Sequence, residues 1–144
     1  ARYSVFCRAQ LRPTPLVEAG KKLAGIATSL IDISDGLSSE LGHLAEASKV
    51  EIEIEPARIP RSSAFERSAS DLGLAPQALQ LMGGEDYALL FTFHPRDRAR
   101  LERRLGRTAT VIGRVLAGRP RVWQVEGTRR RRLAPLAFDH FRSP

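Results

Sequence analysis

Hydrophobic and polar positions alternate along the chain with the period of strands in some segments and of helices in others. Short apolar runs and period-two alternation predict five strands, at 27–33, 50–55, 87–93, 108–116 and 121–125. The segment 50–55 alternates Val and Ile with Glu, the pattern of a strand with one solvated face. The last two strands predict a closing hairpin whose turn is Gly118-Arg119-Pro120.

Helical spacing fills the segments between these strands. Helices are predicted at 15–25, from Leu37 toward Val50, and at 62–72, 76–82 and 95–105. Thr14 is a candidate cap for the first helix, and either Ser34 or Asp35 for the second. Because strands and helices alternate until the closing hairpin, the fold class is α/β or α+β, with helices packed against a mixed β-sheet.

Length and composition indicate one globular domain. The 144 residues are enough to bury a core, and residues 1–144 show no internal boundary or repeat. Hydrophobic residues make up 42% and charged residues 27%, an ordinary globular balance. No window approaches the roughly 18 apolar residues of a membrane span. A single cysteine, Cys7, excludes an internal disulfide and favours a reducing cytoplasm.

The chain carries a basic excess, with 23 Lys and Arg against 16 Asp and Glu and a net charge of +7. Such an excess is typical of proteins with anionic partners, among them nucleotides and nucleic acids. The arginines lie mostly after position 96, most densely at Arg129–Arg132. A run of this kind is more typical of a solvated turn or tail, and no aromatic residues interrupt it to stack on bases. Nucleic-acid binding is therefore not expected.

The segment Asp32-Ile33-Ser34-Asp35-Gly36 places acids where an apolar strand ends. In an extended strand Asp32 and Ser34 share one face, so the intervening isoleucine enters the core. Magnesium prefers oxygen ligands and needs only one or two carboxylates beside phosphate oxygens. The alternative is a plain strand-to-helix junction, with Asp35 as its cap and Asp32 as a rim charge.

The segment Gly83-Gly84-Glu85-Asp86-Tyr87 forms a second acidic constellation about fifty residues later. Two glycines permit positive φ and a close approach of another backbone. An ionised glutamate accepts hydrogen bonds only, so Glu85 suits a ligand with amino groups or a positive charge. The alternative is a glycine turn with two solvated acids. The occurrence of both segments, in this order, favours a shared site.

Taken together, these motifs resemble the carboxy-terminal part of the thiamine-monophosphate kinase family. The resemblance covers most of the chain. The matching segments are Arg12-Pro13, Ser29–Leu37, Gly83–Leu90, Ile112-Gly113 and Phe138–Phe141. It implies the fold of the carboxy-terminal domain of the aminoimidazole ribonucleotide synthetase superfamily. Ala137 and Ala88 depart from the family's usual glycine and acid.

The resemblance also implies roles for individual residues. Asp32 and Asp35 are expected to bind Mg2+, and Ser34 to contact ATP. Glu85 and Phe138 are expected to line the pocket for thiamine monophosphate. This substrate carries a flat cation, which a carboxylate and an aromatic face can receive. No residue is assigned as a catalytic acid or base.

The implied reaction moves the terminal phosphoryl group of ATP onto thiamine monophosphate and yields thiamine diphosphate. The family's amino-terminal ATP-binding domain has no counterpart in these residues, so the isolated chain is expected to be inactive. The complete protein is expected to be a cytoplasmic homodimer without a membrane association. Two alternatives remain: a selenophosphate or aminoimidazole ribonucleotide synthetase or hydrogenase-maturation protein of the same superfamily, and a basic nucleic-acid-binding module built on Arg129–Arg132.

Overall fold

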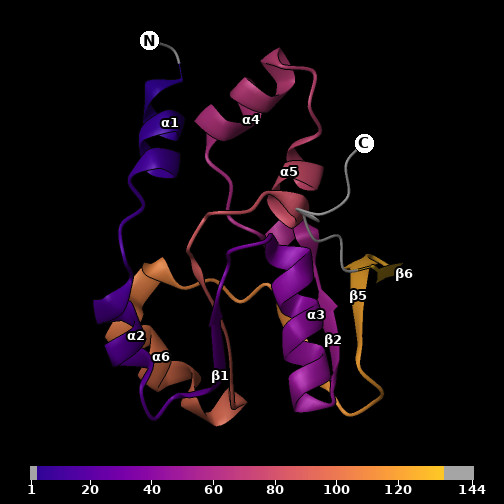
Figure 1. The fold of residues 1–144 in the computed structure, drawn as a ribbon. Coiled ribbons are helices and arrows are strands. Elements are labelled where there is room, and N and C mark those ends of the chain that lie inside the picture. Colours follow the sequence, from indigo (N-terminus) through magenta and orange to yellow (C-terminus); the bar gives the residue numbers. More distant parts are fainter. Residues whose placement is uncertain (1–2, 135–144) are drawn as a thin grey trace.

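The computed structural model describes residues 3–134 and contains helices around two β-sheets (Figure 1). The helices are α1 (Ser4–Leu11), α2 (Val17–Leu23), α3 (Leu37–Ser48), α4 (Ser63–Asp71), α5 (Pro76–Met82) and α6 (Arg98–Leu105). The strands are β1 (Ala27–Asp32), β2 (Glu51–Ile54), β3 (Leu89–Phe93), β4 (Gly113–Leu116), β5 (Arg121–Glu126) and β6 (Arg129–Leu133). Short 3-10 turns occupy Pro56–Arg58, Pro95–Asp97 and Gly106–Thr108. None of the helices in this part of the chain has the length and apolar character needed to cross a bilayer.

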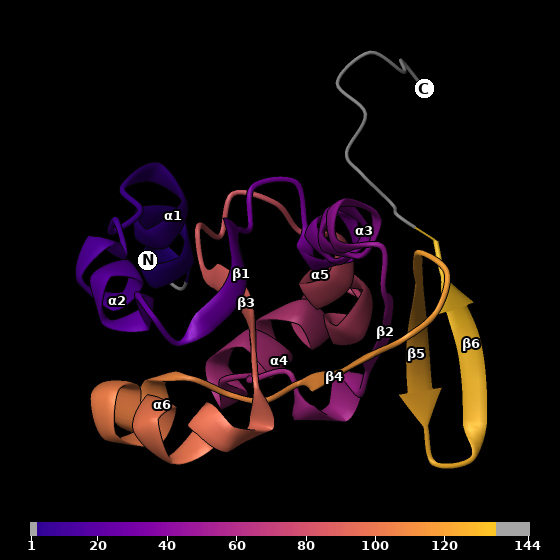
Figure 2. The same cartoon turned by 90° about the horizontal axis from the view of Figure 1, so that it is seen from below.

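The strands form a two-stranded and a four-stranded sheet. β1 pairs antiparallel with β3, and the larger sheet has the order β4-β2-β5-β6. β2 and β5 are parallel, whereas β2–β4 and β5–β6 are antiparallel. Figure 2 shows α3 lying between the β1–β3 pair and the larger sheet. The predicted class, helices packed with mixed sheet, is therefore confirmed, although the strands divide between two sheets.

The β1–β3 pair separates two hydrophobic clusters. Side chains of α3, β2, α5, β5 and β6 form the larger cluster, to which β3 contributes Leu90. On the opposite face, Phe91 and Phe93 of β3 pack with Leu23 of α2 and Leu101 of α6. Successive strand residues thus point into different clusters, as the two-residue period of a strand requires. The pair is anchored on both faces, which fixes the position of its ends.

The predicted closing hairpin is wrong. β4 and β5 do not pair with each other, because β2 lies between them in the sheet. The hairpin partner of β5 is β6, whose residues include the arginine run Arg129–Arg132. That run is an edge strand and not the solvated turn or tail expected from its composition. Charged residues on an edge strand discourage the addition of further strands. Protection of the sheet edge is therefore a structural explanation for the arginine run.

Two local features differ from the sequence prediction. Thr14 does not cap a helix, since α2 begins at Val17 with Leu16 preceding it and no side-chain cap. The helix α1 was not predicted from the sequence pattern. By contrast, α5 has the predicted bounds, and Ser62 caps α4 by accepting a hydrogen bond from the Phe65 amide at 3.1 Å.

The sequence predicts a solvated glutamate face for β2, but in the structure this face is partly covered. Glu53 is only 8% exposed, and its carboxylate pairs with Arg114 at 2.7 Å and Arg130 at 2.9 Å. Arg130 also pairs with Glu51, and its guanidinium lies 4.2 Å from the ring centre of Trp123. The nearby indole N–H of Trp123 and, after it, the guanidinium of Arg130 lower the pKa of Glu51 below its usual value. The side chain of Arg130 is therefore committed to holding three strands together.

Replacing Arg130 by alanine should destabilise the sheet by about 1–2 kcal/mol, because it removes a cation–π contact and two carboxylate partners together. Urea unfolding of the variant measures this difference. Arg129→Ala is the matched control, since Arg129 forms no ion pair with any of residues 3–134, which the structure describes. Equal unfolding midpoints for the two variants would contradict the structural role of Arg130.

Candidate functional site

The two acidic segments meet at one end of the β1–β3 pair. Asp32, the last residue of β1, lies opposite Leu89, the first residue of β3. Beyond these ends the backbones stay together: the Ile33 amide donates to the Ala88 carbonyl at 2.8 Å, and the Tyr87 amide donates to the Ile33 carbonyl at 2.9 Å. Segments about fifty residues apart in sequence therefore form one continuous rim.

Backbone contact between the segments is closest at Ser34. The Glu85 amide donates to the Ser34 carbonyl oxygen at 2.6 Å. A Cβ atom on Gly84 would lie 2.6 Å from that same oxygen, so no larger residue is accommodated without movement. Gly36 has φ +113°, and a Cβ there would lie 3.0 Å from the Met82 carbonyl. The glycines of both motifs thus permit the two loops to touch.

The second segment approaches β3 with an unusual backbone. Glu85 and Tyr87 have φ values of 63° and 50°, in the left-handed region that non-glycine residues rarely occupy. Each such residue costs roughly 1–2 kcal/mol, and these outliers concentrate at functional sites. Asp86, between them, keeps an exposed surface, yet partial desolvation raises the pKa of its carboxyl above the ordinary value.

The carboxylates of the first segment lie at the rim. Asp32 is exposed and Asp35 half-buried, whereas Ile31 and Ile33 pack against the larger cluster as expected. Within residues 3–134 no group of three or more His, Cys, Asp or Glu residues is arranged to hold a metal ion. Two carboxylates suit Mg2+ only if further oxygen ligands come from water, phosphate or another part of the protein.

Neither Ser34 nor Asp35 caps α3, contrary to the prediction. The N-cap is Gly36, which has no side chain. The acceptor is Glu40, one turn inside the helix: its Oε1 lies 3.3 Å from the Asp35 amide and 3.5 Å from the Ser34 hydroxyl. Glu40 is 1% exposed, and its Oε2 is buried without a hydrogen-bond partner among the described residues. Sequence reasoning missed this residue, although an acid in the first turn of a helix is a known capping signal.

Glu85 is exposed, but its carboxylate has a partner from a distant element. The side-chain amide of Gln10, on α1, donates to Oε2 of Glu85. The amino-terminal helix therefore reaches the rim formed by the two acidic segments. Phe138, the other predicted substrate residue, lies outside the described residues, as does the rest of the Phe138–Phe141 motif.

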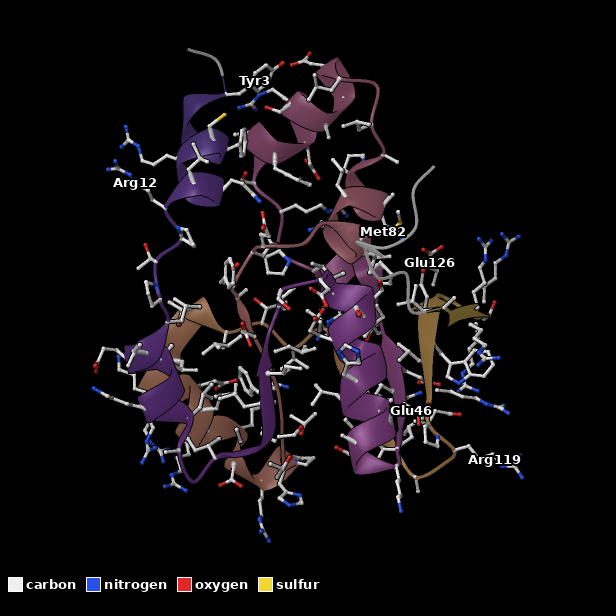
Figure 3. All side chains as sticks on the ribbon, in the orientation of Figure 1. Tyr3, Arg12, Glu46, Met82, Arg119 and Glu126 are labelled. Carbon is white, nitrogen blue, oxygen red and sulfur yellow. The ribbon has the colours of Figure 1, made fainter. Side chains whose placement is uncertain are left out.

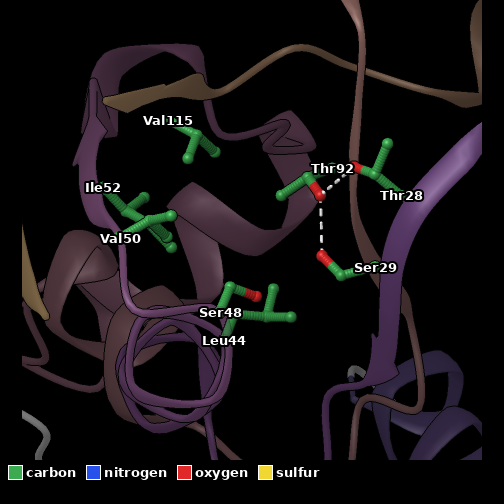
Figure 4. A pocket seen from close by; sticks show the side chains of 8 residues that line it. All are labelled: Thr28, Ser29, Leu44, Ser48, Val50, Ile52, Thr92 and Val115. Atoms are coloured by element: carbon green, nitrogen blue, oxygen red, sulfur yellow. Dashed lines mark hydrogen bonds between the residues drawn. The ribbon is translucent and has the colours of Figure 1, made fainter. Parts of the chain in front are cut away.

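A cavity of about 210 Å³ lies near the start of β1, at the far end from the acidic rim (Figure 4). Thr92 lines it and shares hydrogen bonds with Thr28 at 2.7 Å and Ser29 at 2.6 Å. Ser48 and four aliphatic side chains form the other walls: Leu44, Val50, Ile52 and Val115. Its uncharged lining does not suit a nucleotide or Mg2+.

Comparison with solved structures identifies the class of fold. The structure superimposes on the hydrogenase maturation protein HypE from E. coli with a TM-score of 0.67, covering 83% of this chain and 39% of that one at 20% identity. At this identity the match shows the fold alone. Together with a structural neighbour at 34% identity, this match gives the chain an α/β fold of the aminoimidazole ribonucleotide synthetase type.

Sequence comparison gives the particular family. The chain is 44% identical over 108 residues to the thiamine-monophosphate kinase of Haemophilus influenzae, covering 73% of this chain and 32% of the relative. It is 37% identical over 139 residues to that of Escherichia coli K12, covering 93% and 42%. The crystal structure of the Aquifex aeolicus enzyme matches with a TM-score of 0.72 at 34% identity, covering 84% and 39%. No family model matches the chain.

The chain belongs to the thiamine-monophosphate kinase family and corresponds to the carboxy-terminal part of its members. It spans about a third to two fifths of the length of the curated relatives that it matches. One structural match, AaThiL complexed with AMPPCP and TMP, has a TM-score of 0.73 at 34% identity and covers 87% of this chain and 40% of that one.

Proposed function

We propose that this chain forms the carboxy-terminal part of an ATP-dependent kinase that phosphorylates thiamine monophosphate to thiamine diphosphate. The observation that carries the proposal is the 2.6 Å hydrogen bond from the Glu85 amide to the Ser34 carbonyl, which joins the two acidic motifs. Identities of 37–44% to thiamine-monophosphate kinases support it. So does the related structure AaThiL, which is complexed with AMPPCP and TMP.

In this proposal Asp32 and Asp35 bind Mg2+, and Ser34 contacts the ATP. Hard carboxylate oxygens at the rim are the donors that this ion prefers. When bound, Mg2+ offsets negative charge on the phosphoryl group during transfer. The protein's own contribution is alignment, because phosphoryl transfer depends on positioning and electrostatic stabilisation more than on a strong base. The backbone contacts between the two loops hold the proposed ligand-binding residues in fixed positions, which is what this alignment requires.

Glu85 and Phe138 are proposed to receive thiamine monophosphate. Its thiazolium ring is flat and cationic, so a carboxylate and an aromatic face are complementary to it. Glu85 has an exposed side chain, and its backbone amide donates to the Ser34 carbonyl at 2.6 Å. A substrate held by Glu85 would therefore lie beside the loop proposed to hold the nucleotide.

The proposed enzyme also needs a part of the protein outside residues 1–144. Residues 1–144 are a single domain, and an amino-terminal domain supplies further carboxylates and nucleotide contacts. The complete protein is a homodimer that acts in the cytoplasm. The alternative, nucleic-acid binding by Arg129–Arg132, is disfavoured because Arg130 already binds Glu51, Glu53 and Trp123.

The test is a coupled assay of thiamine diphosphate formation. A protein that joins this chain to its amino-terminal domain should turn over at roughly 1 per second or faster with ATP, Mg2+ and thiamine monophosphate. The isolated 144-residue chain should form no detectable product. Turnover only with selenide or with formylglycinamidine ribonucleotide in place of thiamine monophosphate would transfer the protein to another branch of the superfamily. Full turnover by the isolated chain would refute the division of the site between two domains.

A further inference from the structure

Glu40 is a buried carboxylate directly adjacent to the proposed metal-binding turn. It lies in the first turn of α3 and is 1% exposed. Its Oε1 is within 3.3 Å of the Asp35 amide and 3.5 Å of the Ser34 hydroxyl. No other side chain of the described residues donates to or accepts from Ser34 or Asp35.

Fold stability alone does not explain a glutamate at this position. Burying a carboxylate costs free energy, and well-packed apolar residues are often at least as stabilising as buried charges. The neighbouring helix residues Leu37, Leu41 and Leu44 belong to the larger hydrophobic cluster, where an apolar residue would suit position 40. The second oxygen, Oε2, is buried and unpartnered among the described residues, which adds to the cost.

We propose that Glu40 is a positioning residue that fixes the Ser34-Asp35 turn for cation binding; this rests on the proposed function. A hydroxyl has one proton and two lone pairs. When Ser34 donates its proton to Glu40, only lone pairs remain for a ligand. Ser34 then acts as an acceptor, toward Mg2+ or a nucleotide hydroxyl, and does not donate to a phosphate oxygen. The Glu40 charge also adds to the attraction of the rim for a cation.

The contact to the Asp35 amide has a related effect. That amide points to Glu40, so it is unavailable to an anionic ligand at the start of α3. The Ser39 and Glu40 amides both donate to the Gly36 carbonyl, at 2.9 and 3.3 Å. The helix start is thus closed to phosphate at these three amides, and the turn is specialised for a cation.

Three variants of the complete protein test this role. Glu40→Met keeps the side-chain size and removes both acceptors, and Glu40→Gln keeps one neutral acceptor. Glu46→Gln is the matched control, because Glu46 is exposed on the same helix at the end away from the turn (Figure 3). Each is compared with the wild type in ligand-free hydrogen exchange, in Mg2+ titrations at saturating ATP, and in thermal unfolding.

The expected results separate positioning from stability. Glu40→Met should raise the exchange rate of the Asp35 amide about tenfold and the half-saturating Mg2+ concentration about 10- to 100-fold, the usual cost of losing an outer partner of a metal site. Glu40→Gln should raise half-saturation about threefold, since it loses charge and keeps a hydrogen bond. Glu46→Gln should match the wild type in both. The melting temperature of Glu40→Met does not decide between the two roles, because the loss of two hydrogen bonds and the removal of a buried carboxylate act in opposite directions.

Specific outcomes overturn the proposal. Unchanged Asp35 exchange in Glu40→Met, or unchanged Mg2+ half-saturation, would show a purely structural residue. If Glu40→Met does not fold, unchanged half-saturation in Glu40→Gln overturns the proposal. A wild-type protein without Mg2+-dependent binding of ATP would defeat the proposed function, and the exchange rate of Asp35 would then decide alone whether Glu40 holds the turn.

Discussion

Asp32→Asn in the complete protein should lower Mg2+-dependent turnover about 100-fold or more and leave the melting temperature nearly unchanged. The carboxylate is proposed to bind the ion that stabilises charge during transfer, and loss of one such group typically costs 10²–10³ in rate. Asp32 is exposed at the end of β1, so stability should change by no more than about 0.5 kcal/mol. Steady-state kinetics over a range of Mg2+ concentrations, with thermal unfolding of the same samples, measure both effects.

Glu46→Gln provides the control for this substitution. It also removes an exposed carboxylate, but one that lies on α3 and far from the rim. It should retain wild-type turnover. If Asp32→Asn lowers stability and turnover to a similar degree, Asp32 is a structural residue of the strand-to-helix junction, the alternative that its sequence pattern left open.

Gly84→Ala should reduce turnover about 100-fold and destabilise the protein by roughly 1–3 kcal/mol. The new Cβ would lie 2.6 Å from the Ser34 carbonyl oxygen, closer than real contacts allow. The loops must then separate, and overpacking of this kind costs 1–3 kcal/mol. A displacement of about 1 Å at a catalytic site can lower a rate 10²-fold. Kinetics and urea unfolding report the two effects.

Gly20→Ala is the matched control, because a Cβ on Gly20 would meet no atom within 4 Å and the residue lies inside α2. It should stabilise the protein by about 0.5–1 kcal/mol through its better helix propensity and leave turnover intact. Wild-type activity in Gly84→Ala would mean that close contact between the two acidic segments is not needed for the reaction.

Local patterns in the sequence were sufficient to predict the elements that carry the rim. The predicted strand 27–33 is one residue shorter in the structure, the helix predicted from Leu37 begins there, and the helix 76–82 has the predicted bounds. These segments have a clear hydrophobic period and strong boundary residues, such as Gly36 and Pro76. The ligand roles of Asp32, Asp35, Ser34, Glu85 and Phe138 stay predictions.

Long-range pairing could not be predicted in the same way. Nothing in the pattern of 50–55 indicates that this strand inserts between β4 and β5. The run Arg129–Arg132 has no apolar period, and it is a strand because β5 and the ring of Trp123 provide its partners. Glu40 was missed for a similar reason: its burial depends on how the preceding loop folds over α3, which is a tertiary contact.

The contact between Ser34 and Glu85 also has a consequence for the order of folding. The chain between them, about fifty residues, contains two more helices and a strand beyond α3, and closing a loop of that length costs about 3 kcal/mol of chain entropy. Such non-local contacts form late, after their surroundings are in place. A partly folded intermediate that already contains α3 would therefore have only one of the two acidic loops in position. Competence to bind ligand at this rim should appear only with the final, cooperative step of folding.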